Sequence, residues 1–219
     1  MLEKARVVII CLYNGSKGAG MEDKFLHLAE NRRSIYGLGK RKILAEDEVV
    51  RLVEDMVKNC PTPFNSQSGR VVVLFEEMHY KLWNIVKEIL RAQVPAEAFA
   101  KTEEKINSFA AGYGTILYFI DESVTIELQS SFPLYADKFP VWAEQANGIL
   151  QYMIWTALAE NKVGASLQHY NPLIYNKVHE EWQVPSEWCL RAQMPFGSIE
   201  MPSAEKTYLP VEERVKVFK

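Results

Sequence analysis

Two arginines and a serine stand side by side as Arg32-Arg33-Ser34. A guanidinium is always charged, and its planar set of donors matches the oxygens of a phosphate. The Ser34 hydroxyl can donate to a phosphate or to a ring carbonyl. The triplet therefore suits an anionic ligand, although cations near the end of a helix are also typical of a solvated cap.

A polar loop comes directly before an apolar run. It reads Asn65-Ser66-Gln67-Ser68-Gly69-Arg70, and residues 71–75 are all apolar. A carboxamide offers both a donor and an acceptor, which suits a heterocycle edge such as that of an isoalloxazine or a pterin. The alternative is a turn whose side chains bond to its own backbone, which is a weaker explanation for a polar run this dense.

Two further segments could contact a ligand. Small residues in Gly164-Ala165-Ser166 let the backbone approach a flat molecule, and Leu167-Gln168-His169 follow. His169 is able to titrate, but a structural histidine bonded to backbone is an equal alternative. Lys206, near the C-terminus, suits a phosphate as a point charge, and its alternative is a solvated surface lysine.

The elements that must position these segments follow from hydrophobic periodicity. Helices are predicted over 24–34, 46–59, 79–92, 95–109 and 140–160. Continuous apolar runs predict buried strands over 70–75 and 115–120, and weaker strand signals lie at 163–167, 189–192 and 211–218. The last of these could instead be an arm. Helix 140–160 is apolar on more than one side, which predicts a central position or a place in a subunit interface.

The mixed order of helices and strands predicts one α+β domain with a small sheet flanked by helices. Two clear strands make too small a sheet to bury the apolar faces of the predicted helices, so we expect a partner chain to contribute. The domain is predicted over residues 21–219. Residues 1–20 are interpreted as an N-terminal extension or a cloning remnant, although their short apolar run also resembles a signal peptide.

Composition excludes several classes of protein. The chain has 219 residues and a formal net charge of −3, so it lacks the excess of basic residues that is typical of a nucleic-acid-binding protein. Its three cysteines form no CxxC pair and its four histidines lack metal-ligand spacing, which argues against a metal site. No apolar run reaches the roughly 18 residues of a membrane span. We therefore expect a cytoplasmic protein with no membrane or nucleic-acid partner.

Taken together and in this order, the segments resemble the nitroreductase family. The similarity is to the branch of fatty-acid-repression-mutant-like FMN nitroreductases, and it runs from about Met21 to the C-terminus. Its most specific strings are residues 65–70 and 166–171, and the helix opening His79-Tyr80-Lys81-Leu82-Trp83 adds to it. The resemblance implies a nitroreductase-like α+β fold with a small, mainly antiparallel sheet flanked by long helices. It also implies an intertwined homodimer that binds FMN at its interface.

The resemblance further implies which residues contact FMN. Arg32, Arg33 and Ser34 would meet the phosphate, ribityl chain and ring, and Lys206 would hold the phosphate. The other subunit would supply Asn65, Ser66, Gln67 and Ser68. The backbone of Gly164, Ala165, Leu167, Gln168 and His169 would pass near flavin N5. No catalytic side chain and no metal are expected, because the chemistry belongs to the flavin.

The implied activity is an FMN-dependent oxidoreductase that takes a hydride from NADH or NADPH through flavin N5. Nitroaromatic, quinone or related small-molecule acceptors would be reduced in a ping-pong cycle. Ser68 stands where many members of the family have proline, and the central region is short. Both departures imply a substrate pocket that differs from theirs. Phe132, Tyr135 and Trp142 could cover the slot or simply pack the core. Two alternatives stay open: a flavin-binding regulatory or FMN-storage protein with little turnover, and an interaction protein without cofactor.

Overall fold

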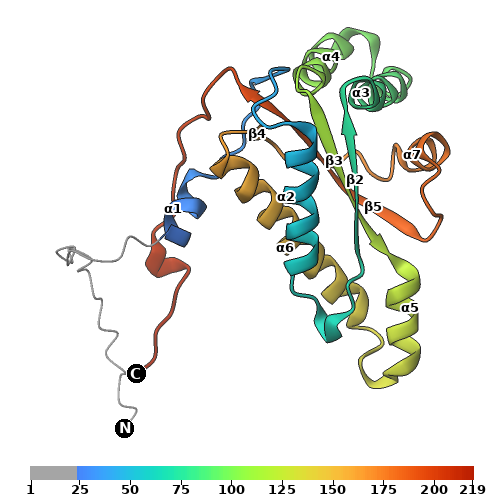
Figure 1. Cartoon of the computed structure of the whole chain (residues 1–219), viewed down its shortest axis with the longest axis vertical. Coiled ribbons are helices and arrows are strands. Elements are labelled where there is room, and N and C mark those ends of the chain that lie inside the picture. The colour runs from blue at the N-terminus through green and yellow to red at the C-terminus, as the bar shows by residue number, and fades with distance from the viewer. Residues whose placement is uncertain (1–23) are drawn as a thin grey trace.

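An antiparallel sheet of five strands lies between two layers of helices (Figure 1). The computed structural model describes residues 24–219. The strands run in the order β1-β5-β3-β2, and β4 also pairs with β5. Their bounds are β1 Leu38–Gly39, β2 Gly69–Phe75, β3 Gly114–Asp121, β4 Gly164–Ala165 and β5 Trp188–Ile199. This confirms the predicted α+β class and the small antiparallel sheet.

Strand β3 is the centre of the core, because every one of its residues is buried. Its side chains alternate between the two faces of the sheet, as a pleated strand requires. Ile116 and Tyr118 join the cluster formed with α2 and α6, whereas Leu117 and Phe119 join the cluster formed with α3, α4 and α7. The core therefore has two halves that share one strand.

Seven α-helices surround the sheet within residues 24–219. Figure 1 shows α2 and α6 side by side on one face, and α3, α4 and α7 on the other. The helices are α1 Lys24–Asn31, α2 Glu46–Asn59, α3 Glu76–Arg91, α4 Ala96–Ala110, α5 Glu122–Ser131, α6 Phe139–Glu160 and α7 Tyr175–Trp182. The periodicity predicted α2 with both ends correct, and α6 within one residue. The predicted central place of α6 is also confirmed, since eight of its residues are buried.

Three elements depart from the sequence expectations. Helix α5 was not expected, and only Thr125 of its residues is buried, so it lacks a clear apolar stripe. Helix α7 was not expected either. Strand β5 extends seven residues beyond the predicted 189–192 segment, through Pro195 and Gly197. Both residue types usually end a strand. Glycine is required at 197 because β1 approaches so closely that a Cβ there would lie 2.2 Å from the Gly39 carbonyl oxygen.

Two further expectations need correction. Strand β2 forms where predicted but is only partly buried apart from Leu74, because it is an edge strand of this sheet. Segment 211–218 forms no strand within the described residues. It belongs to an exposed C-terminal arm with one 3-10 turn, Val211–Glu213, that runs away from the sheet past α1 (Figure 1). The predicted extension over residues 1–20 lies outside the described residues.

Candidate functional site

Trp155 of α6 brings two of the predicted segments together. The Arg32 guanidinium carbon lies 4.3 Å from the centre of the Trp155 ring. The indole Nε1 donates to the Ala165 carbonyl oxygen at 3.2 Å, and the same oxygen accepts from the Ile35 amide at 2.9 Å. Residues 32–35 and β4 are therefore held edge to edge near the C-terminal end of α6. We call this group, Arg32–Ser34 with Gly164–Ala165 and Trp155, the arginine end.

The arginine end carries positive charge that the protein does not neutralise. Within residues 24–219, Arg32, Arg33 and Lys206 form no ion pair with a carboxylate. Burial lowers the pKa of Arg32, and the charge of the neighbouring Arg33 lowers it further, while Tyr152 opposes the change. Arginine nevertheless keeps its charge in proteins. Two adjacent, partly buried guanidiniums without a carboxylate are suited to an anionic ligand.

The C-terminal arm reaches the same place. Arg33 donates to the carbonyl oxygen of Ala204, two residues before Lys206. The ammonium of Lys206 lies 5.0 Å from the ring of Tyr208. Lys206 is therefore close in sequence to a contact of the arginine end, and its exposed side chain is unconstrained by any carboxylate in the part of the chain that the structure describes. The Ser34 hydroxyl likewise makes no hydrogen bond there.

Gly164 allows the close packing of the arginine end. A Cβ at this position would lie 2.9 Å from Ile199 Cγ1, 3.0 Å from Ile35 Cγ2 and 3.1 Å from Leu38 Cδ2. These distances are too short for most side-chain contacts, so only glycine lets β4 approach the segment that carries the arginines. The sequence reasoning had linked the small residue to a flat ligand, whereas the structure shows a packing reason for it.

The three residues after Ser166 differ in what they offer a ligand. Gln168 exchanges backbone hydrogen bonds with Gln193 at 2.7 and 2.9 Å, and its buried carboxamide donates to Ser166 Oγ at 3.1 Å. Leu167 is half-buried against the core. His169 is exposed and makes no side-chain hydrogen bond within residues 24–219. Of these three residues only His169 is thus exposed, while the Gln168 side chain already has an internal partner.

The carboxamide loop, Asn65–Ser68, lies at the other end of α6. The turn Pro63–Asn65 packs there, and the Phe64 ring stacks on Trp142 with centroids 6.2 Å apart. Asn65 and Ser66 have no side-chain hydrogen bond in the described part of the chain. Ser68 Oγ is buried and has no hydrogen-bond partner. The loop therefore holds several polar groups whose bonding capacity is unused.

One chain does not bring the two ends together (Figure 1). Trp142 and Trp155 are thirteen residues apart on α6. At about 1.5 Å of rise per residue, this separates the two ends by roughly 20 Å along the helix. The sequence predicted both groups of residues. Their separation is the geometry required if the loop of one copy completes the arginine end of another.

Sequence reasoning missed Trp155 and Phe64 as site residues. Trp155 lies inside a long apolar helix, where an aromatic residue is normally explained by packing, and Phe64 lies in a loop between two polar stretches. The three aromatic residues suspected of covering a slot, Phe132, Tyr135 and Trp142, lie around Phe64, next to the carboxamide loop. The only sign of this cluster in the sequence was the density of aromatic residues over 132–142.

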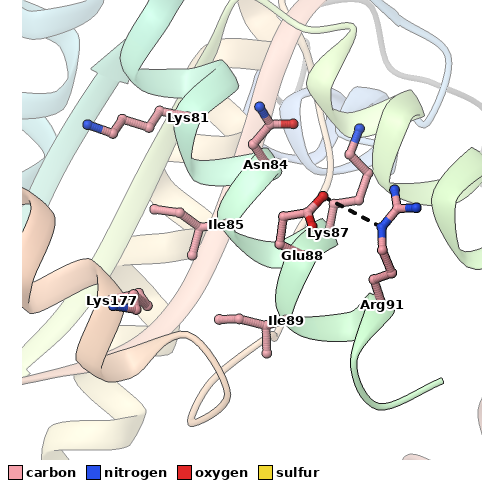
Figure 2. Close-up of a pocket in the computed structure, with 8 residues that line it drawn as sticks. All are labelled: Lys81, Asn84, Ile85, Lys87, Glu88, Ile89, Arg91 and Lys177. Atoms are coloured by element: carbon pink, nitrogen blue, oxygen red, sulfur yellow. Dashed lines mark ion pairs between the residues drawn. The ribbon is translucent and has the colours of Figure 1, made fainter.

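One cavity in the described part of the chain lies away from both ends. It measures about 400 Å³ and lies between α3 and α7 (Figure 2). Its cations are all paired with carboxylates: Lys81 with Glu181, Lys87 with Glu103, Arg91 with Glu88 and Glu103, and Lys177 with Glu180. Because each charge is already compensated, this cavity lacks the feature that distinguishes the arginine end.

Two kinds of feature are missing from residues 24–219. No group of three histidine, cysteine, aspartate or glutamate residues there could hold a metal ion. No helix in this range is long and apolar enough to cross a membrane.

Comparisons with known proteins agree with this geometry. The model of the Nitroreductase family matches residues 29–198. The chain is similar to the nitroreductase FRM2 of Saccharomyces cerevisiae, with 34% identity over 187 residues that cover 84% of this chain and 93% of FRM2.

Solved structures give the same result. The nitroreductase CinD from Lactococcus lactis, in complex with nicotinic acid, is 47% identical with a TM-score of 0.84, and the match covers 89% of this chain and 100% of CinD. A nitroreductase with bound FMN from Desulfitobacterium hafniense shares the fold, with a TM-score of 0.66 and 14% identity over 91% of this chain and 100% of that one. The chain therefore belongs to the nitroreductase family.

Proposed function

We propose that two copies of this chain bind FMN between the arginine end of one and the carboxamide loop of the other, and catalyse NAD(P)H-dependent reduction of small acceptors. The observation that carries the proposal is the pair of adjacent guanidiniums that have no carboxylate partner within residues 24–219 and are held beside β4 through Trp155. An FMN phosphate is the kind of anion that such a site recognises.

The unused polar groups fit FMN. Arg32, Arg33 and Lys206 would hold the phosphate, and Ser34 would donate to the ribityl chain or to a ring carbonyl. In the carboxamide loop, the buried Ser68 hydroxyl has no partner within the described residues. A buried polar group of this kind is costly unless something satisfies it, and a ligand with alternating donors and acceptors would do so.

Exposed apolar surface supports a second copy. In the C-terminal arm, Tyr208 is 75% exposed and Phe218 is 93% exposed. Ile149 and Tyr152 of α6 are also exposed. Apolar side chains spread over an arm and a neighbouring helix are typical of a surface that another protein covers. We propose that this other protein is an identical chain.

FMN, when bound, supplies hydride acceptance at N5 from NADH or NADPH and the return of electrons to an acceptor. The residues of the chain bind the phosphate, orient the ring and limit access of water. No side chain needs to act as an acid or base, because the flavin would carry the chemistry. We place the enzyme in the cytoplasm, where the free thiols of Cys60 and Cys189 would be stable.

Nitroaromatic and quinone compounds are the proposed acceptors. Structures of CinD contain 4-nitrophenol and chloramphenicol, and the chain is 46% identical to that protein. Both ligands carry a flat aromatic ring.

The test uses the purified full-length protein. FMN should raise its Tm and give a yellow complex, and NADH or NADPH should bleach that colour without oxygen. Addition of 4-nitrophenol or a quinone should restore the colour. Bound FMN that neither nucleotide reduces would overturn the enzymatic proposal in favour of a storage or regulatory protein. No FMN binding at all would overturn the assignment of the site.

A further inference from the structure

The backbone adopts an uncommon conformation in the carboxamide loop and in Phe64, the residue before it. Phe64, Asn65 and Gln67 have φ values of 54°, 50° and 49°, which lie in the left-handed region. Ser66 between them has a φ of −64°. Side chains other than glycine disfavour positive φ, and an aromatic residue does so more than asparagine. Two backbone hydrogen bonds close this turn, from the Asn65 amide to the Thr62 carbonyl oxygen and from the Ser66 amide to the Pro63 carbonyl oxygen, both at 3.0 Å, and further contacts support it.

One end of the loop is held by hydrogen bonds. The backbone N–H of Gln67 donates to Thr62 Oγ1 at 3.0 Å. The Arg70 guanidinium donates to the Gln67 carbonyl oxygen at 2.6 Å and pairs with Asp121 at 2.8 Å. These bonds restrain Gln67 and the residues after it, but none of them restrains Phe64.

Aromatic contacts hold the other end. The Phe64 ring contacts four rings from the segment that leads into α6 and from its first turn. Their centroids lie 4.9 Å away for Phe132, 6.5 Å for Tyr135, 5.4 Å for Phe139 and 6.2 Å for Trp142. We call these five residues the aromatic clamp. Phe139 is only 2% exposed, so the clamp is anchored in the core.

Burial of the Phe64 ring does not explain its presence. The residue is 53% exposed, so more than half of its surface faces outward in this chain. A glycine or an asparagine would reach the same backbone conformation more easily. The ring is therefore best explained by the ring contacts that it makes next to Asn65 and Ser66, whose side chains have no hydrogen bond within residues 24–219.

We propose that Phe64 is a positioning residue, whose ring fixes the carboxamide loop in its binding conformation before FMN arrives. This inference rests on the proposed function. A preorganised loop loses less freedom when it binds, so the ring would strengthen FMN binding without touching the flavin. Conformations of this kind often persist at ligand sites because the surrounding structure imposes them.

Three substitutions of Phe64 separate the effect of its ring from the effect of its backbone conformation. Phe64→Tyr keeps the ring, Phe64→Leu keeps an apolar side chain, and Phe64→Gly removes the ring while making positive φ easy. We expect Phe64→Leu and Phe64→Gly to weaken FMN binding by on the order of tenfold, and Phe64→Tyr to stay within about twofold. Tyr80→Leu is the matched control, since Tyr80 is a part-exposed aromatic residue of α3 outside both ends.

The measurements are the Kd of FMN for the apoprotein, the absorption spectrum of the bound flavin, and the Tm of the apoprotein. The Leu and Gly variants should shift the flavin spectrum and change the apoprotein Tm by less than about 4 °C. Native affinity in Phe64→Gly would overturn the inference, because the ring would then be dispensable. A larger fall in apoprotein Tm would also overturn it, because the ring would then support the fold. If the native protein fails to bind FMN, the proposed function itself fails.

Discussion

The two ends of α6 present polar groups by different means. At the arginine end, charged side chains extend from a segment without positive φ values that is joined to β4 by the Ile35 amide. At the other end, Phe64 and the carboxamide loop that follows it have three positive φ values, and the loop packs against the aromatic clamp. Charge acts over a distance and tolerates small errors in position. Hydrogen bonds to a heterocycle edge require accurate placement, which explains why the second end needs an unusual backbone.

The largest expected effect lies outside both ends and sets the pH range in which they can be compared. His79 is fully buried, its Nδ1 lies 2.7 Å from Thr115 Oγ1 and its Nε2 lies 3.2 Å from the Ala110 carbonyl oxygen. That carbonyl can only accept, so Nε2 carries the proton and Thr115 donates to Nδ1. Burial lowers the pKa of His79 to about 4.

Because the folded pKa is lower than the unfolded one, the unfolded chain binds this proton more readily. Stability should be fully present above pH ~6.5 and fall as the pH decreases toward 4, by roughly 3 kcal/mol in all. Urea unfolding between pH 4 and 8 measures this, with His79→Gln as the variant that cannot titrate. A native profile as flat as that of the variant would contradict the prediction.

Arg32→Ala should cause the largest loss at the arginine end. It removes a charge-assisted contact and the stacking on Trp155, and we expect FMN binding to weaken by about 1.5–3 kcal/mol. Titration of the apoprotein with FMN measures the change. Arg91→Ala is the control, because Arg91 is paired with Glu88 and Glu103 on the far side of the sheet. If both variants bind FMN with equal affinity, the lack of a carboxylate partner does not mark an arginine as part of the FMN site.

Gly164→Ala should destabilise the arginine end through packing alone. The added methyl would force Ile35, Leu38 and Ile199 to move, which we expect to cost ~1–3 kcal/mol of unfolding free energy. Gly148→Ala is the matched control, since a Cβ there has nothing within 4 Å and the position is helical. We expect the control to be neutral or stabilising by up to ~1 kcal/mol. Similar losses in both variants, measured by thermal unfolding, would refute the packing argument.

The smallest expected effect concerns Trp155. Trp155→Phe keeps a ring beneath Arg32 but loses the hydrogen bond to Ala165, whose oxygen retains the Ile35 amide. We expect a loss of ~0.5–1.5 kcal/mol in stability. Trp155→Leu also loses the cation–π contact, worth a further ~0.5–1 kcal/mol, and should weaken FMN binding more than Trp155→Phe does. If both variants bind FMN with equal affinity, the ring does not position Arg32.

Much of the fold could be predicted because several segments carry a strong local pattern. The apolar spacing of residues 46–59 is visible from the sequence, and α2 has these bounds. Helices α5 and α7 were not predicted, since each buries only one residue and shows no long apolar stripe. Strand β5 was predicted only in part, because the tolerance of Pro195 and Gly197 depends on neighbouring strands that the sequence does not show.

For the site, the chemical types of Arg32–Ser34, Asn65–Ser68 and Lys206 were evident from the sequence, and so was strand β2 that follows the loop, whereas the helix predicted over 24–34 ends at Asn31, before the arginines. Tertiary structure alone decided that Trp155 joins Arg32 to Ala165, that the loop lies roughly 20 Å away along α6, and that Phe64 has a positive φ. Side-chain chemistry is a property of each residue and can be read locally. Distances and forced backbone angles arise from contacts between residues far apart in the chain, which exist only once the core has formed.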